Sequence, residues 1–172
     1  ASLETFSTMP PRPSRADDSC IALETFENAT VGAFPPGWRV RKDEAKQVYR
    51  VEREGTRQFL RADSNGLGIQ AAKEREWNLD EYPVLVWEWR PRRFPSGADE
   101  RTGKNDSVLS VYLLVPYSRI RGPKAVKYVW SAVVPVGTRL ESNGGLTQVR
   151  VLRTGSEARD DWVQERVNVR DD

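Results

Sequence analysis

The sequence predicts an all-β protein, built as a jelly-roll-like antiparallel β-sandwich. Three observations indicate this fold class. Roughly ten short segments alternate apolar with charged residues, which is the period of a strand that buries one face. Clusters of glycine, proline and asparagine separate these segments at the spacing typical of sandwiches and jelly rolls. No internal repeat and no coiled-coil heptad interrupts the pattern.

The length predicts one domain preceded by a tail. A chain of 172 residues is long enough to bury a sizeable core, and all-β domains of this size are common. Residues 1–19 hold three of the eleven prolines and no sustained periodicity, so we expect an extended N-terminal tail or linker there. The β-sandwich domain is then expected to span residues 20–172.

The first half of the domain predicts short strands joined by tight turns. The Pro-Pro-Gly sequence before Trp38 fixes a turn that directs this tryptophan into a strand. Gly55 lies between two alternating segments, as in a hairpin. The strands expected from these patterns cover residues 20–28, 38–42, 46–54, 57–63 and the start of 67–82, the rest of which is expected to be a loop.

The second half carries the most apolar segments. Leu85, Trp87 and Trp89 share one face of the segment 83–90. The segment 106–116 is apolar on both faces, which is typical of a central strand covered by a second layer. These two segments are therefore expected to form the middle of the sandwich. Three further strands are expected, over residues 127–135, 147–153 and 162–169.

The residue types that the sequence lacks exclude several classes of enzyme. The chain has no histidine, so it contains no Ser-His-Asp triad, no histidine-ligated zinc or haem and no imidazole acid or base. The single cysteine, Cys20, excludes an internal disulfide. We expect Cys20 to be a buried, inert thiol at the start of a strand, the alternatives being a lipid anchor or an intermolecular disulfide.

Charge and hydropathy indicate neither nucleic-acid binding nor a membrane span. Lys plus Arg is 27 and Asp plus Glu is 25, which gives a formal net charge of +2. The two signs are interspersed along most of the chain, whereas binding to nucleic acid calls for basic residues clustered on one face. No apolar run approaches the ~20 residues that a membrane helix needs.

Motifs spread along the chain resemble those of a known family. They are GW after a Pro-Gly turn, LRA with a Ser-Asn-Gly turn, YPVL with two tryptophans after it, the acidic loop ADERTGKND, YVW with a following glycine, and WVQERVNV. Together they are similar, from Cys20 to Asp172, to DUF3047, a family of bacterial proteins of unknown function that are typically exported. The resemblance implies a β-sandwich like those of carbohydrate-binding modules and a periplasmic or extracellular location, and it implies no activity.

The chain departs from the pattern of this family in two places. Lys104, Asn105 and Asp106 stand where similar members tend to carry Gly-Asp-Asp, which argues against a metal role for the acidic loop. Similar members also tend to continue, with a further strand or two, past an Asp-Tyr that would follow Asp172. The domain is therefore expected either to lack its closing strands or to end differently. The start at Ala1, without a methionine, suits a mature exported protein or a trimmed chain.

The acidic loop is the candidate metal site. Two cations lie among its oxygen donors, and the donor spacing of an EF-hand is missing. We therefore expect Arg101 to pair with Asp99 or Asp106 and to order the loop. No metal or other cofactor is predicted, and Ca²⁺ is the alternative. The donors that a calcium ion would use are Asp99, Glu100, Asn105 and Asp106.

The six tryptophans are either core residues or part of a ligand site. Sugar-binding proteins stack pyranose rings on exposed tryptophan and tyrosine, although the same residues also fill β cores. The tryptophans expected in the core are Trp38, Trp87 and Trp130.

Trp89, Arg90 and Tyr112, near the acidic loop, are predicted to bind a ligand. Neighbouring polar residues are expected to form either a binding face that hydrogen-bonds hydroxyls or uronates, or a solvated outer face with cross-strand ion pairs. The other aromatic and polar residues available for the site are Trp77, Tyr117, Trp162, Glu88, Ser131, Arg150 and Arg166.

The sequence predicts a non-catalytic binding or interaction module, with a polysaccharide as the favoured ligand. The first alternative is a structural subunit that packs against another protein in an envelope or extracellular assembly, where strand edges would suit β-augmentation. The second is a polysaccharide hydrolase or lyase. Two carboxylates about 5–9.5 Å apart would suit glycoside hydrolysis, and Glu88 with Asp106, expected across adjacent strands, is the only pair that the sequence nominates.

Overall fold

The computed structural model describes residues 20–64, 68–102 and 106–172, and the predicted tail over residues 1–19 lies outside these ranges. The described residues divide into two compact units, one of residues 20–64 and 69–76 and the other of residues 68, 77–102 and 106–172. Strands make up most of the regular structure of the described residues, which confirms the all-β class. The elements are β1 (Trp38–Val40), η1 (Asp43–Val48), β2 (Tyr49–Glu54), β3 (Arg57–Ala62), β4 (Ala71–Lys73), β5 (Val84–Trp89), β6 (Leu109–Ser118), β7 (Gly122–Ser131), β8 (Arg139–Ser142), β9 (Thr147–Thr154), β10 (Val163–Asn168) and η2 (Val169–Asp171), where η marks a 3₁₀ helix.

The first unit contains two small antiparallel sheets. β1 pairs with β4, and β2 pairs with β3 as a hairpin. Glu54 pairs with Arg57, so Gly55 and the next residue form a two-residue turn. Gly55 has a φ of 58°, which a residue without a Cβ adopts at little cost. Val51 of β2 is fully buried, and the predicted hairpin is confirmed.

The predictions for residues 20–28 and for Cys20 are wrong. Residues 20–28 form no strand. The Glu24 carboxylate accepts the backbone N–H groups of Thr25 (2.9 Å) and Phe26 (2.7 Å), so donors that a sheet would use are satisfied locally. Phe26 also has a φ of 58°, outside the extended region. Cys20 is exposed, and not a buried residue at the start of a strand.

The segment predicted as a strand from residue 46 begins as a helix. Asp43–Val48 forms η1, and β2 starts at Tyr49. In a 3₁₀ helix, residues three apart lie above one another, so Ala45 and Val48 share one side, and both are buried. The alternation of apolar and charged residues over 46–54 therefore corresponds to a strand only from Tyr49 onward.

The second unit contains a four-stranded sheet with the order β6-β7-β9-β8. β6 and β7 form one antiparallel hairpin, and β8 and β9 form another. β9 lies between β7 and β8 and runs parallel to β7, so the sheet is mixed. The connection from β7 to β8, residues 132–138, must therefore pass across β9. The prediction of antiparallel pairing did not include this parallel pair.

β7 is an interior strand of this sheet. Its residues from Lys127 to Ser131 are all buried, whereas β6 is an edge strand within the described part of the chain. The prediction that residues 106–116 form a central strand is therefore wrong. A strand that is apolar on both faces can still lie at an edge and leave side chains exposed, as Leu114 and Val115 are.

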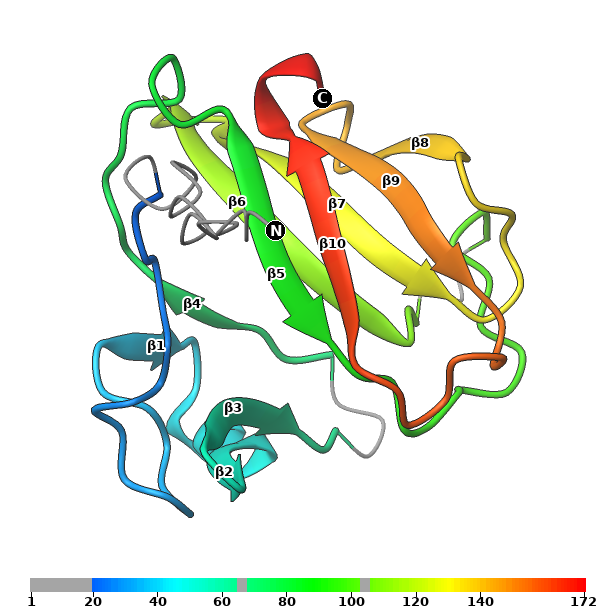
Figure 1. The fold of residues 1–172 in the computed structure, drawn as a ribbon. Coiled ribbons are helices and arrows are strands. Elements are labelled where there is room, and N and C mark those ends of the chain that lie inside the picture. Colours follow the sequence, from blue (N-terminus) through cyan, green and yellow to red (C-terminus); the bar gives the residue numbers. More distant parts are fainter. Residues whose placement is uncertain (1–19, 65–67, 103–105) are drawn as a thin grey trace, which may run out of the picture. The chain divides into compact units, whose positions relative to one another are not determined.

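A second layer packs on the four-stranded sheet. β5 pairs with β10, and Figure 1 shows these two strands, green and red, in front of β6 and β7. Aromatic rings fill the space between the layers. The ring centroid of Trp87 lies 5.4 Å from that of Tyr128, and the centroid of Trp89 lies 5.7 Å from that of Trp130. The second unit is therefore a two-layer β-sandwich in which Trp87 and Trp130 belong to the core, as predicted.

A buried carboxylate joins the two layers. Glu165 of β10 is 7% exposed, and its Oε1 accepts hydrogen bonds from Trp89 Nε1 (3.0 Å) and from Arg153 Nε of β9 (2.7 Å). The arginine supplies the positive charge that a buried carboxylate needs. The hydrogen bond to Glu165 in turn raises the pKa of Arg153. This contact holds the Trp89 indole in one orientation within the core.

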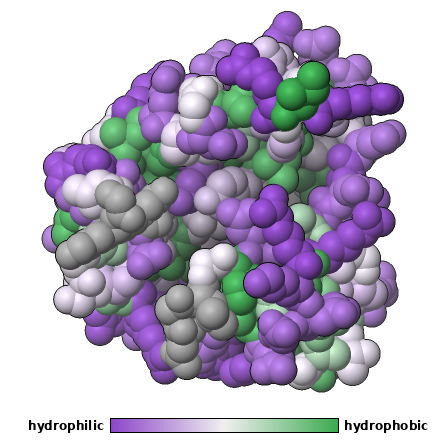
Figure 2. All heavy atoms as spheres, turned by 180° about the vertical axis from the view of Figure 1, so that it is seen from behind, coloured by the Kyte–Doolittle hydropathy of each residue, from purple (hydrophilic) through white to green (hydrophobic). Residues whose placement is uncertain are grey.

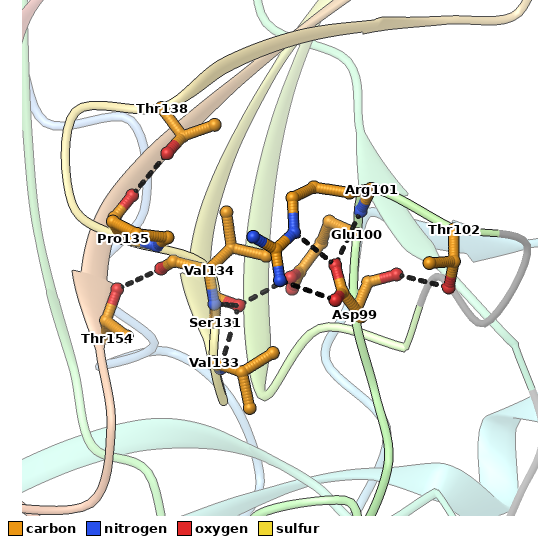
Figure 3. Close-up of polar contacts among 10 residues, drawn as sticks. All are labelled: Asp99, Glu100, Arg101, Thr102, Ser131, Val133, Val134, Pro135, Thr138 and Thr154. Atoms are coloured by element: carbon orange, nitrogen blue, oxygen red, sulfur yellow. Dashed lines mark hydrogen bonds and ion pairs between the residues drawn. The ribbon is translucent and has the colours of Figure 1, made fainter.

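The connection from β7 to β8 covers the other face of the four-stranded sheet. Val134 in this connection is fully buried and packs against valines of β7 and β9. Polar contacts hold it there (Figure 3): Ser131 Oγ accepts the Val134 N–H (2.9 Å), and Thr154 Oγ1 donates to the Val134 carbonyl. β7 and β9 are thus covered on both faces, which explains their nearly continuous burial.

Glu165→Ala is expected to lower the free energy of unfolding by about 2–3 kcal/mol, because it leaves the Trp89 N–H in the core without its acceptor. The Arg153 side chain is 45% exposed, so in the variant its guanidinium is hydrated, which limits the loss of stability. Urea unfolding followed by tryptophan fluorescence measures the change. Asp80→Ala, which removes only an exposed ion pair to Arg170, is the control and should cost less than about 0.5 kcal/mol. Equal losses in the two variants would contradict this role of Glu165.

Candidate functional site

The outer face of the β5–β10 layer is open to solvent and largely polar. Opposite residues of an antiparallel pair share a face, so the register fixes which side chains point outward. Trp87, Trp89 and Glu165 point toward the other layer, and the residues next to them in sequence point away from it. The outward residues, all exposed or half-buried, are Val84, Val86, Glu88, Arg90, Trp162, Gln164, Arg166 and Asn168.

Arg90 and Trp162 form an ordered pair at one end of this face. The register pairs Trp89 with Val163, so Arg90, directly after β5, and Trp162, directly before β10, are neighbours. The Arg90 guanidinium carbon lies 4.7 Å from the Trp162 ring centroid. This cation–π contact holds two half-buried side chains together at the edge of the layer.

The two loops at this end contribute a second pair of the same kind. The Arg159 guanidinium carbon lies 5.1 Å from the Phe94 ring centroid. The loops are joined through their backbones, since the Asp160 N–H donates to the Pro91 carbonyl (2.9 Å). The residues that we name the arginine–aromatic end are Arg90, Phe94, Arg159 and Trp162.

The arginine–aromatic end has the chemistry of a binding site. Indole and phenyl rings stack against the C–H faces of sugar rings. Guanidinium groups donate parallel hydrogen bonds to hydroxyl or carboxylate oxygens and stay protonated, so they suit recognition better than proton transfer. Glu88, Gln164 and Arg166 add donors and acceptors along the same face. The site suits a polar ligand that contains a flat or puckered ring.

The three residues predicted to bind a ligand do not come together. Trp89 is 5% exposed and donates its indole N–H to Glu165, so its ring belongs to the core and cannot serve as a surface platform. Arg90 points to the opposite side of β5. Tyr112 lies on β6, on the face of the four-stranded sheet that is turned away from β5 and β10, where Lys127 Nζ is 5.5 Å from its ring centroid. Of the three, Arg90 remains at the candidate site.

The wider set of polar residues is also divided. Glu88, Arg90 and Arg166 share the outer face of the β5–β10 layer, and this shared face does not decide between the two predicted arrangements. Ser131 is fully buried at the end of β7. Arg150, which is paired in register with Tyr128, points between the layers.

Arg150 forms a buried cluster of its own. Its Nε donates to Asp172 Oδ1 (3.1 Å), and the Tyr128 hydroxyl donates to Asp172 Oδ2 (2.9 Å). Burial, followed by the hydrogen bond to Asp172, raises the pKa of Tyr128. A cavity of about 170 Å³ opens beside Arg150 and Asp172. Because the arginine is already engaged by a carboxylate, we assign this cluster to holding η2 against β9.

The two carboxylates nominated for catalysis are not on adjacent strands. Glu88 lies on the outer face of β5, and the residue opposite it is Gln164. Asp106 lies in the loop before β6, which belongs to the other layer. The expected pairing of these carboxylates across neighbouring strands therefore does not occur.

The acidic loop is ordered by ion pairing, as predicted. Arg101 donates to both carboxylate oxygens of Asp99, from Nε (2.9 Å) and from Nη2 (2.7 Å), as Figure 3 shows. The backbone N–H of Arg101 donates to the same carboxylate (3.0 Å). These hydrogen bonds from Arg101 lower the pKa of Asp99 to about 2. The carboxylate is therefore occupied by a cation from its own loop.

The other predicted metal donors do not gather around Asp99. Glu100 is turned inward and accepts a hydrogen bond from the buried Ser131 hydroxyl. Asn105 lies outside the described residues, and Asp106 is exposed. Within the ranges that the structure describes, no group of three or more Asp, Glu or Cys side chains is arranged to hold a metal ion.

The first unit has a separate charged pocket. A cavity of about 120 Å³ is lined by residues that include Glu24 and Lys73, whose charged atoms lie 2.6 Å apart. Trp38, half-buried and stacked on Phe26, donates its indole N–H to Glu24 (2.9 Å). Burial raises the pKa of Glu24, but hydrogen bonds from Lys73 and Trp38 outweigh it and leave the pKa below its usual value. The cluster joins β1, β4 and the segment before β1.

From the sequence, Trp162 is only one of several aromatic residues available for the site, and Phe94 and Arg159 are not predicted to belong to it. One signal could have selected Trp162. Residues 162, 164 and 166 alternate with the apolar positions of the last strand, so they belong to one outward face. The pairing of this strand with β5, which brings Trp162 to Arg90, has no local signal in the sequence.

The fold and the site together define a two-layer β-sandwich with an open arginine–aromatic face on its smaller layer. Residues 36–172 match the family of proteins of unknown function DUF3047. The chain therefore belongs to the DUF3047 family. No curated protein and no solved structure matches it. Among the described residues, no helix has the length and hydropathy that a transmembrane segment requires.

Carbon-13 NMR of the carboxyl groups should find that Asp99 titrates near pH 2 and not at its ordinary 3.8. The stability that the Asp99–Arg101 pair contributes is then present above about pH 4 and is lost as the pH falls toward 2. Arg101→Gln should return the pKa of Asp99 toward its ordinary value, whereas Arg170→Gln, at a remote exposed arginine, should not. A wild-type midpoint near pH 4 would disprove this description of the loop.

Calcium is expected to change the melting temperature of the protein only slightly, because Arg101 already occupies the Asp99 carboxylate and Glu100 is turned inward. Differential scanning fluorimetry with calcium chloride and with a chelator tests this expectation. Magnesium chloride at equal ionic strength is the control. A shift of several degrees with calcium but not with magnesium would contradict this expectation and would support a metal site in the acidic loop.

Proposed function

We propose that this chain is a non-catalytic binding module of the bacterial envelope or exterior, and that its ligand is a carbohydrate held on the outer face of the β5–β10 layer. The observation that carries the proposal is the contact between Arg90 and Trp162, a guanidinium and an indole ordered together at an open surface. The periplasmic or extracellular location rests on the resemblance of the motifs to exported proteins.

The shape of the face favours a polymer. β5 and β10 pair over their full lengths, so outward side chains form two parallel rows. A strand rises about 3.3 Å per residue, so outward side chains in each row recur about every 7 Å. A chain of sugars lying along the strands would meet successive polar groups and reach the ring of Trp162 at the end.

The charge of the face favours an acidic sugar. Arg90 and Arg166 lie on the face, and Arg159 lies at its end. A guanidinium binds a carboxylate through two parallel hydrogen bonds, which neutral sugars do not offer. We therefore favour a polysaccharide that contains uronic acid. Catalysis is less well supported, because the residue opposite Glu88 is an amide and not a second carboxylate.

Trp162→Ala is expected to weaken binding to an acidic polysaccharide about tenfold or more, because it removes the stacking surface and the support of Arg90. Arg90→Gln should weaken binding to acidic glycans more than to neutral ones. A glycan array identifies the ligand for the wild type, and isothermal titration calorimetry then measures the dissociation constants.

Tyr117→Ala is the matched control, because it removes an exposed aromatic ring from a strand outside this face. Its affinity should equal that of the wild type. Trp89→Ala is unsuitable as a binding test, because loss of a buried tryptophan is expected to cost about 3–5 kcal/mol of stability. Two results would refute the proposal: a wild type that binds no polysaccharide, or a folded Trp162→Ala variant with full affinity.

A further inference from the structure

The β6–β7 hairpin differs in charge from the rest of the chain. No acidic residue occurs between Asp106 and Glu141, so the interspersion of charges expected from the sequence fails here. The positive charge of this stretch exceeds the net charge of the whole protein, which is +2. The basic residues in it are Arg119, Arg121, Lys124, Lys127 and Arg139.

The tip of the same hairpin exposes large apolar side chains. Ile120, in the turn, is 97% exposed, and Leu114, Val115 and Tyr117 are 51%, 43% and 51% exposed. Leu114 and Val115 are consecutive in a strand, so they point to opposite faces of the hairpin. Figure 2 shows the molecule from behind, and apolar groups protrude among hydrophilic ones at its upper right, where the β6–β7 hairpin of Figure 1 ends. Exposed apolar side chains therefore lie on both faces of the hairpin and in its turn.

The turn holds Ile120 outward. Ser118 at the end of β6 pairs with Gly122 at the start of β7, so three residues form the turn. Ser118 Oγ accepts the backbone N–H groups of Ile120 (3.3 Å) and Arg121 (3.2 Å). Gly122 has a φ of 90°, a conformation that a side chain would strain. The exposed isoleucine is thus part of an ordered turn.

Basic side chains surround this apolar tip. Arg119 and Arg121 flank Ile120 in the turn. Lys124 Nζ lies 4.3 Å from the ring centroid of Tyr117, so a cation is held directly beside an exposed aromatic ring. Segments at a lipid–water interface have this composition, since apolar groups enter the acyl region, tyrosine lies at the boundary, and Lys and Arg contact anionic headgroups.

We propose that the tip of the β6–β7 hairpin, residues 114–124, inserts into the surface of a membrane that contains anionic phospholipids. A groove in a partner protein would contact one face of an edge strand. Here the apolar side chains lie on both faces and in the turn, which favours a medium that surrounds the tip. The positive charge of the hairpin specifies the anionic headgroups. The inference does not depend on the carbohydrate face, which other strands form.

Cosedimentation of the full chain with phosphatidylcholine vesicles, with and without phosphatidylglycerol, tests this proposal. The wild type should bind the anionic vesicles at least tenfold more tightly and lose affinity as salt is raised. Ile120→Ser should weaken binding about tenfold, and so should the double variant Arg119→Gln/Arg121→Gln. Both sites are exposed, so these variants keep the fold. The matched control, Arg39→Gln/Arg170→Gln, removes the same charge elsewhere and should bind as the wild type does.

A second measurement distinguishes insertion from adsorption. In a Cys20→Ser background, Ile120→Cys labelled with the environment-sensitive dye NBD should shift its emission to the blue on anionic vesicles. The same label at Arg170→Cys should not shift. The proposal is overturned if the two vesicle types bind equally, or if Ile120→Ser binds as the wild type does. It is also overturned if dextran sulfate competes for the protein while the label at position 120 shows no shift.

Discussion

The packing of aromatic rings between the two layers is the interaction on which the second unit depends. Two tryptophans of β5 meet Tyr128 and Trp130 of β7, and Glu165 accepts the indole N–H of one of them. Because these contacts use one face of β5 and β10, the other face has no part in the core and is free to carry polar groups. The display of Arg90 beside Trp162 is therefore a consequence of how the core is filled.

Local features of this protein could be predicted from its sequence, whereas strand pairing could not. The alternation over residues 84–89 correctly gives the buried face of β5, and the order of charges in the acidic loop correctly predicts the contact between Arg101 and Asp99. The prediction that Trp89 and Arg90 share one site fails because neighbours in a strand point to opposite sides. β7 is an interior strand because β9 pairs with it in parallel. No local sequence pattern predicts a pairing between two strands that are separated along the chain by another strand.

The two proposed surfaces lie on different strands and use different chemistry. The β5–β10 face offers guanidinium groups and an indole to a hydrated ligand that keeps most of its water. The β6–β7 tip offers apolar side chains that gain by leaving water, with cations next to them. Neither surface requires a deep cleft. Together the proposals describe a protein held at a lipid surface while it binds a polysaccharide beside it.

The long separation of β5 from β10 along the chain determines when, during folding, the face proposed to bind carbohydrate can form. Trp89 and Glu165, which bond to each other, are 76 residues apart, and β5 pairs with no strand but β10 among the described sheets. Contacts that close long loops form late in folding, because the chain loses conformational entropy before the new contact contributes any stabilising free energy. During synthesis, a nascent chain without β10 would present no such face. Under the proposed function, only a chain that has formed the complete sandwich would therefore bind the ligand. A truncated or stalled chain would not compete with the folded protein for it.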